Sequence, residues 1–199
     1  MNIQAVLFDL GGVILRTEYQ APREHLAERL TMTYEDLDKI VFASETSRLA
    51  SVGKLSTKDH WAAIMKRLGL PQSEAEQVYS EFFAGDVLDH ELLDFIRSLR
   101  PQRKTALISN GWPDLRDYIS RSGFVDAFDT LIVSAEVGLM KPDPRIYDLA
   151  LSRLEAQAPQ SALVDDTPVN VEAANALGMH GILFESTVQV RRELESILA

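Results

Sequence analysis

Polar residues stand where three apolar runs of this chain end, and together they could act on an anionic group. Asp9 ends the apolar run in AVLFDLGGVIL, and Ser109 with Asn110 ends a second run. Asp165 and Asp166 end a third. Carboxylate, hydroxyl and amide oxygens suit a hard cation and the oxygen-rich anions that such cations bind. Whether these residues meet depends on the elements that position them.

Apolar runs alternate with amphipathic helical patterns along most of the chain. Asp143 before Pro144, and Thr167 before Pro168, are predicted caps at helix starts. Alternating strands and helices predict an α/β fold, with a Rossmann-like three-layer core around a parallel sheet of about five strands. The predicted strands are Ile3–Leu10, Lys104–Ser109, Thr130–Val133, Ala162–Asp165 and Gly181–Phe184.

One stretch interrupts this alternation. Between Leu15 and Lys104 the sequence shows only helical patterns and no strand candidate. We interpret it as a small all-helical cap inserted after the first strand. The predicted division is therefore an α/β core of residues 1–16 and 88–199 and a helical cap of residues 17–87.

Composition excludes several classes of protein. The chain has 199 residues, of which 46% are hydrophobic and 25% charged, as in ordinary globular proteins. It contains no cysteine, so disulfides, thiolate metal sites and thiol nucleophiles are excluded. A formal net charge of −10 argues against a nucleic-acid partner.

The same survey gives expectations about location and partners. No segment approaches the roughly 20 apolar residues that cross a bilayer, and no signal peptide is evident. We therefore expect a cytoplasmic protein with no membrane partner, present as a monomer or homodimer. A local positive pocket for a small anion remains compatible with the acidic composition.

The polar residues at the strand ends are expected to converge. Ligands of open parallel sheets bind beyond the carboxyl ends of the strands. Lys141, in the loop before Pro142, can reach the same crevice. Carboxylates so close together would repel unless a cation lies among them, and an all-oxygen set favours Mg²⁺. A lysine and a hydroxyl beside that cation suit a phosphate-like substrate.

Four motifs carry a resemblance to a known family. They are FDLGGV, LISNG, the lysine of GLMKPDP, and LVDDTPVN, in this order along the chain. With these motifs the chain resembles hydrolases of the haloacid dehalogenase superfamily, in the phosphatase-like branch with a helical cap inserted after the first motif. The resemblance covers essentially the whole chain.

The resemblance implies a role for each motif residue. Asp9 would be the nucleophile that forms an aspartyl-phosphate, and it would also ligate Mg²⁺ together with the backbone carbonyl of Gly11. Ser109 would hydrogen-bond the transferring phosphoryl group, and Asn110 beside it would also bind phosphate. Lys141 would neutralise charge on that group and on Asp9.

The last motif would complete the metal site. Asp166 would be the second metal carboxylate, with Asp165 next to it and Asn170 in the outer shell, where Asn170 would orient Asp166. The implied activity is a Mg²⁺-dependent phosphatase acting on a small phosphorylated metabolite.

Gly11 departs from the family pattern. Phosphatases of this superfamily commonly carry a second Asp there, which protonates the leaving group and then activates water. Glycine keeps the backbone carbonyl but cannot move a proton. General acid–base catalysis is typically worth about 10²–10⁴-fold, so we expect slower turnover and not its abolition.

Two other functions stay open. A metal-free 2-haloacid dehalogenase also uses an attacking Asp, but it has no need of the Asp165–Asp166 pair and usually has an aromatic residue at the position of Gly11. A non-catalytic phosphate-sensing or partner-binding protein could have kept the pocket and lost the acid.

The motif residues also have ordinary structural explanations when each is taken alone. Asp9 could cap a turn, and Ser109 with Asn110 could simply form one. Lys141 could be a solvated loop residue, and the Asp165–Asp166 pair could cap the next helix.

The predicted cap carries no motif that identifies a substrate. Arg48 and Lys54 lie where a substrate-reading loop could be, but we expect them to be surface charges. Trp61 is expected in the core of the cap. The histidines show no metal-ligand spacing, and His60 is the only one we would test as a base.

Overall fold

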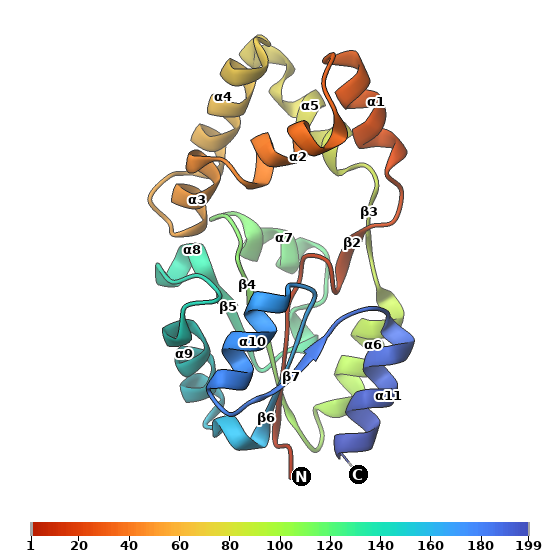
Figure 1. The fold of residues 1–199 in the computed structure, drawn as a ribbon, viewed down its shortest axis with the longest axis vertical. Helices are drawn as coiled ribbons and strands as arrows, with labels where there is room; N and C mark the ends of the chain where they lie inside the picture. Colours follow the sequence, from red (N-terminus) through yellow and green to blue (C-terminus); the bar gives the residue numbers. More distant parts are fainter. Residues whose placement is uncertain (1, 199) are drawn as a thin grey trace.

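The computed structural model describes residues 2–198, and its centre is a sheet of five parallel strands (Figure 1). The strand order is β5-β4-β1-β6-β7. This confirms the predicted Rossmann-like α/β fold. The strands are β1 (Ala5–Phe8), β4 (Lys104–Ser109), β5 (Thr130–Val133), β6 (Ser161–Asp165) and β7 (His180–Leu183).

Helices cover both faces of the sheet because both faces of each strand are apolar. In β1, Val6 and Phe8 pack on one face, while Ala5 and Leu7 pack on the other. The first face is covered by α6 (His90–Leu99) and α11 (Thr187–Leu198), and the second by α9 (Pro144–Leu154) and α10 (Pro168–Ala176). The shorter helices α7 (Leu115–Arg121) and α8 (Ser134–Val137) follow β4 and β5.

The expectation of no strand between Leu15 and Lys104 is wrong. Strands β2 (Leu15–Thr17) and β3 (Asp86–Leu88) pair with each other as an antiparallel ribbon. Each has three residues, too few to show an alternating pattern, and the pairing joins distant parts of the chain. The predicted boundaries at 16/17 and 87/88 fall inside these two strands.

Between β2 and β3 the chain is helical and has its own core. Leu26, Trp61, Met65 and Phe82 are buried there, so Trp61 lies in this core as expected. The segment lies beyond the carboxyl ends of the sheet strands (Figure 1). That this segment, residues 17–87, forms a separate cap stays a prediction. Its helices are α1 (Ala21–Arg29), α2 (Tyr34–Phe42), α3 (Glu45–Ser51), α4 (Thr57–Leu68) and α5 (Ala75–Phe83).

Helix starts follow the expected chemistry in most places. The side chain of Asp143 accepts a hydrogen bond from the Arg145 amide at the start of α9, which confirms the predicted cap. Thr167 precedes α10, but its side chain does not cap that helix. Within residues 2–198, no helix has the length and apolarity needed to cross a membrane.

Asp89 ties the antiparallel ribbon to the sheet domain. Its carboxylate accepts from the Leu92 amide at the start of α6, from Thr187, and from Arg16 at 2.9 Å. Burial alone would raise the pKa of Asp89, but the hydrogen bonds from Thr187, Leu92 and Arg16 outweigh it and lower that pKa. The ionised form therefore stabilises the fold.

We predict that Asp89→Ala lowers the free energy of unfolding at pH 7 by about 1–2 kcal/mol, the cost of a lost helix cap. The pKa of Asp89 is lower in the folded protein than in the unfolded chain. The ionised carboxylate therefore contributes fully to the free energy of unfolding above the unfolded-state pKa of about 4, and this contribution is lost as the pH falls through the folded-state pKa. Urea unfolding of the wild type and Asp89→Asn should therefore differ most at neutral pH and converge below pH 4. A difference independent of pH would contradict the ionic part of this assignment.

Candidate functional site

Three adjacent strands bring the predicted site residues to one edge of the sheet. β1 lies between β4 and β6 and pairs with both. Asp9 follows β1, Ser109 ends β4, and Asp165 ends β6. Their side chains consequently lie at the carboxyl edge, where open parallel sheets bind ligands.

Lys141 supplies a buried cation to this edge. It is 3% exposed, and its Nζ lies 2.9 Å from Oδ1 of Asp9 and 2.5 Å from Oδ2 of Asp165. An ammonium group out of contact with water needs paired charges and satisfied hydrogen bonds. Lys141 therefore links the ends of β1 and β6 and is not a solvated loop residue.

Asn110 holds the backbone of Lys141 in place. Its Oδ1 accepts from the Lys141 amide at 2.8 Å, and its Nδ2 donates to the Lys141 carbonyl at 2.9 Å. The sequence predicts that Asn110 binds phosphate, but in the structure its side chain is bonded to the main chain of Lys141. Asn110 thus connects the loop after β4 to the loop that carries the lysine.

Asp165 is fully buried, and both of its oxygens are hydrogen-bonded. Oδ1 accepts from the Thr167 amide and from Asn170 Nδ2, each at 2.9 Å, while Oδ2 pairs with Lys141. The expectation that Asn170 orients Asp166 is wrong, because its amide bonds Asp165. Asp165 also binds the amide of Thr167, the residue that precedes α10.

Asp9 keeps one oxygen available. Its Oδ1 accepts from the Leu10 amide at 2.7 Å and faces Lys141, whereas Oδ2 has no hydrogen-bond partner among residues 2–198. Burial raises the pKa of Asp9 to about 6; Lys141 lowers this pKa, and Asp165 raises it. A further cation beside Asp9 would favour its ionised form.

Asp166 is the exposed member of the group. Thr167 Oγ1 donates to its Oδ1 at 3.2 Å. Partial burial of the carboxyl group, followed by the charge of Asp165, raises the pKa of Asp166. Like Asp9, it lies where negative charge is in excess.

Asp9, Asp165 and Asp166 form what we call the carboxylate cluster. Each offers one oxygen, and these oxygens all lie within 4.8 Å of one another. Three carboxylates here face the single ammonium group of Lys141, and such an all-oxygen set fits a hard divalent cation. Because the oxygens of Asp165 are already engaged, Asp9 and Asp166 have the free lone pairs.

Ser109 completes the predicted set from the neighbouring strand. The residue is 5% exposed, and its hydroxyl makes no hydrogen bond to any part of the chain that the structure describes. The hydroxyl of this largely buried residue is thus available as a donor to a ligand at the sheet edge.

The two glycines after Asp9 have different structural reasons. Gly12 has φ of +73°, and a Cβ placed on it would lie 1.9 Å from Oδ2 of Asp166. Gly11 lacks a positive φ, and a Cβ there would meet nothing within 4 Å. The close approach of Asp166 therefore requires glycine at position 12 and not at position 11.

His60 is not placed to act as a base. It is fully buried in the helical segment, with Nδ1 2.9 Å from Thr46 Oγ1 and Nε2 3.0 Å from the Val41 carbonyl. Burial lowers its pKa, so the ring is neutral near pH 7. Arg48 and Lys54 are exposed, as expected of surface charges.

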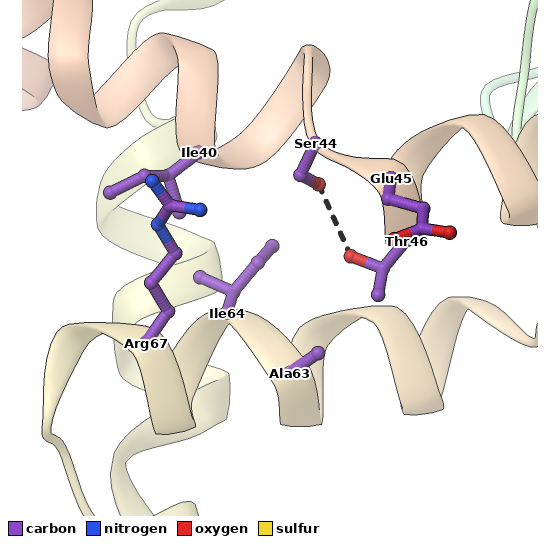
Figure 2. Close-up of a pocket in the computed structure, with 7 residues that line it drawn as sticks. All are labelled: Ile40, Ser44, Glu45, Thr46, Ala63, Ile64 and Arg67. Carbon is purple, nitrogen blue, oxygen red and sulfur yellow. Dashed lines mark hydrogen bonds between the residues drawn. The ribbon is translucent and has the colours of Figure 1, made fainter.

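A hollow of about 160 Å³ lies elsewhere, between α2, α3 and α4 (Figure 2). Figure 2 shows Arg67 of α4 beside Ile40, and the hydrogen bond between Ser44 and Thr46 across from Ala63. None of the predicted site residues lines this hollow. We therefore do not consider it part of the candidate site.

Sequence reasoning missed two features of this edge. It singled out Gly11 as the departure from the family pattern and did not distinguish Gly12 from it, although only Gly12 is closely approached by Asp166. It also did not foresee that Lys141 pairs with Asp165. No local pattern indicates that pairing, because the two residues belong to different elements.

We predict that Gly12→Ala destabilises the protein by about 1–3 kcal/mol, the usual cost of a non-glycine residue at a strained backbone position. Its Cβ would also displace Asp166. The matched variant Gly11→Ala should stay within about 0.5 kcal/mol of wild type. Urea unfolding of the two alanine variants compares them directly, and equal losses would refute the distinction.

Comparison with known proteins agrees with this geometry. A family profile described as a haloacid dehalogenase-like hydrolase matches residues 3–178. The sesquiterpene phosphatase astK of Aspergillus oryzae is 26% identical over 99% of this chain and 97% of its own length. A phosphorylated carbohydrates phosphatase of Thermotoga maritima is 30% identical over 90% of this chain and 84% of its own length. Bifunctional epoxide hydrolase 2 of Rattus norvegicus is 26% identical, and this chain spans only 39% of its length.

Solved structures share the fold. One is a haloacid dehalogenase family enzyme from Bacteroides thetaiotaomicron, whose structure was determined in complex with magnesium and inorganic phosphate. It superposes with a TM-score of 0.75 over 92% of this chain and 94% of the other chain. The two sequences are 18% identical. With the profile match over most of its length, the chain belongs to the haloacid dehalogenase-like hydrolases.

Proposed function

We propose that this hydrolase is a Mg²⁺-dependent phosphatase that acts on a small phosphorylated metabolite through an aspartyl-phosphate on Asp9. The observation that carries the proposal is the environment of Asp9. Its Oδ1 is held by Leu10 and Lys141, and its Oδ2 is free beside two further carboxylates. The phosphatases among its relatives support the same activity.

Asp9 and Asp166, with the backbone carbonyl of Gly11, would hold the metal ion. Bound there, Mg²⁺ would neutralise the carboxylate cluster and the phosphoryl oxygens. Asp165 would act indirectly, since its oxygens are occupied in positioning Lys141 and the start of α10.

In the first step, the free oxygen of Asp9 attacks phosphorus, and the bond from phosphorus to the leaving-group oxygen breaks. Ser109 donates a hydrogen bond to the phosphoryl group, and Lys141 balances its charge. In the second step, water attacks phosphorus, Asp9 is released, and inorganic phosphate leaves. Asn110 contributes by fixing the loop of Lys141.

The alternatives fit the site less well. A metal-free dehalogenase leaves the second carboxylate of the cluster, Asp166, without a role. A phosphate sensor would need the pocket but not the free nucleophilic oxygen of Asp9. We therefore keep both as outcomes of the test below.

The first test is phosphate release from an aryl phosphate with and without Mg²⁺. Wild type should require the metal, and Asp9→Asn should abolish turnover because an amide cannot form the acyl-phosphate. Asp166→Ala should weaken Mg²⁺ binding by more than about tenfold, measured by calorimetry. Asp94→Asn, at a side chain 76% exposed, serves as the matched surface control.

Each alternative has a distinct signature in this test. Release of halide from 2-haloacids without metal would indicate the dehalogenase. Phosphate binding without turnover would indicate the sensor. Unchanged Mg²⁺ affinity in Asp166→Ala would refute the metal assignment.

The second test concerns the missing acid. Without a donor at Gly11, the wild-type rate should fall steeply from aryl to alkyl phosphates, because an alkoxide leaves poorly unless protonated. A Cβ at position 11 would meet nothing within 4 Å. Gly11→Asp should therefore speed alkyl substrates selectively, by up to about 10²–10⁴-fold. The isosteric control is Gly11→Asn, which cannot supply a proton.

A folded Gly11→Asp protein without this gain, together with a flat leaving-group series in wild type, would mean that another group supplies the proton. Melting temperatures of all three proteins establish folding first. With both ring nitrogens of His60 engaged, that group would have to be another residue or water.

A further inference from the structure

Trp112 lies in the loop that leaves the candidate site. It is three residues after Ser109, so its Cα lies within about 11 Å of that of Ser109. The two residues before Trp112 anchor the loop, since Asn110 bonds Lys141 and the Gly111 amide donates to Ser134 Oγ at 3.0 Å. The position of Trp112 is therefore tied to the carboxyl edge of the sheet.

The helical segment meets the sheet domain at Trp112. Its ring stacks on Phe42 with centroids 5.8 Å apart and planes inclined by 23°. Its Nε1 donates to Ser47 Oγ at 3.3 Å, and its ring centroid lies 4.6 Å from that of His60 with the planes inclined by 64°. Phe42 ends α2, which lies on the side of the segment nearest the strand ends (Figure 1).

Aromatic rings continue from Trp112 across this junction. Phe83 contacts Phe42 at 6.2 Å and Tyr79 at 4.8 Å between centroids. Phe42 is 44% exposed and Tyr79 is 39% exposed, although each ring also packs against other aromatic rings. We name Phe42, Tyr79, Phe83 and Trp112 the aromatic wall. Exposed apolar surface gathered beside polar groups is typical of a ligand-binding surface.

The charged groups near the wall carry no excess of positive charge. Asp114, Asp86 and Arg121 are the charged groups that act on the Tyr79 hydroxyl. Asp86 is itself paired with Arg23 at 2.8 Å. Arg23 also pairs with Asp38 at 3.2 Å. Three carboxylates and two guanidinium groups leave no excess positive charge for a second anionic group of a substrate.

We propose that the aromatic wall binds the apolar part of the substrate, so that the preferred phosphate monoester carries an uncharged hydrocarbon group of several carbons. Phe42 is then a specificity-determining residue. The inference rests on the proposed function, because it takes phosphate binding at the sheet edge as given. It favours hydrocarbon esters over phosphorylated sugars or substrates with two anionic groups.

Binding of methyl-, butyl- and octylphosphonate to the Mg²⁺-loaded protein tests this directly, because none of them is hydrolysed. In wild type, affinity measured by calorimetry should rise with chain length, by at most about fourfold for each methylene that is buried. In Phe42→Ala, octylphosphonate should bind roughly tenfold more weakly, while methylphosphonate binds as before. Phe42→Leu should recover much of the loss.

Two further variants keep the test decisive. Tyr79→Ala should weaken octylphosphonate in the same direction, and it replaces Phe42→Ala if that protein does not fold. Val188→Ala removes an apolar side chain that is 73% exposed on α11, and it should behave as wild type.

The outcomes separate this inference from the proposed function. If methylphosphonate does not bind and aryl phosphates are not hydrolysed, the proposed function fails. If methylphosphonate binds but chain length has no effect, the aromatic wall is not the binding surface. An equal chain-length effect in wild type, Phe42→Ala and Tyr79→Ala would overturn the inference in the same way.

Discussion

The ammonium group of Lys141, buried between Asp9 and Asp165, is the interaction on which the site depends. Two carboxylates at the ends of neighbouring strands would repel each other without it. Asp165 then extends the network to the start of α10 through the Thr167 amide and Asn170. One buried charge therefore joins two strands, one loop and one helix. Stability and the geometry around Asp9 have the same origin.

Sheet topology explains why so few residues suffice to form the candidate site. Because β1 is central, the residue that follows it has β4 on one side and β6 on the other. β4 delivers Ser109 and Asn110, and β6 delivers the acidic pair. Each side chain comes from the end of a rigid strand, so the fold limits how far the site can relax. The loop of Lys141 is the exception, and Asn110 fixes it.

The five sheet strands could be predicted within about two residues, because strands buried on both faces are continuous apolar runs. Strands β2 and β3 could not be predicted, because each has only three, partly polar residues, which are too few to show an alternating hydrophobic pattern. The pairing of carboxylate oxygens with Lys141 and Asn170 depends on the directions in which the side chains point. The spacing of residues in the sequence does not determine those directions. Gly11 and Gly12 are the clearest case. The same residue occurs twice for different reasons, and only the position of Asp166 tells them apart.

The ribbon of β2 and β3 has a consequence for how this family diversifies. The chain leaves the sheet domain and returns to it through two strands that are hydrogen-bonded to each other, so the ends of the helical segment are about 5 Å apart. Closing a loop between two such ends costs little more for a long segment than for a short one. The segment also has an apolar core of its own. Evolution can exchange it, and with it the surface over the nucleophile, without altering the strands that hold the carboxylates.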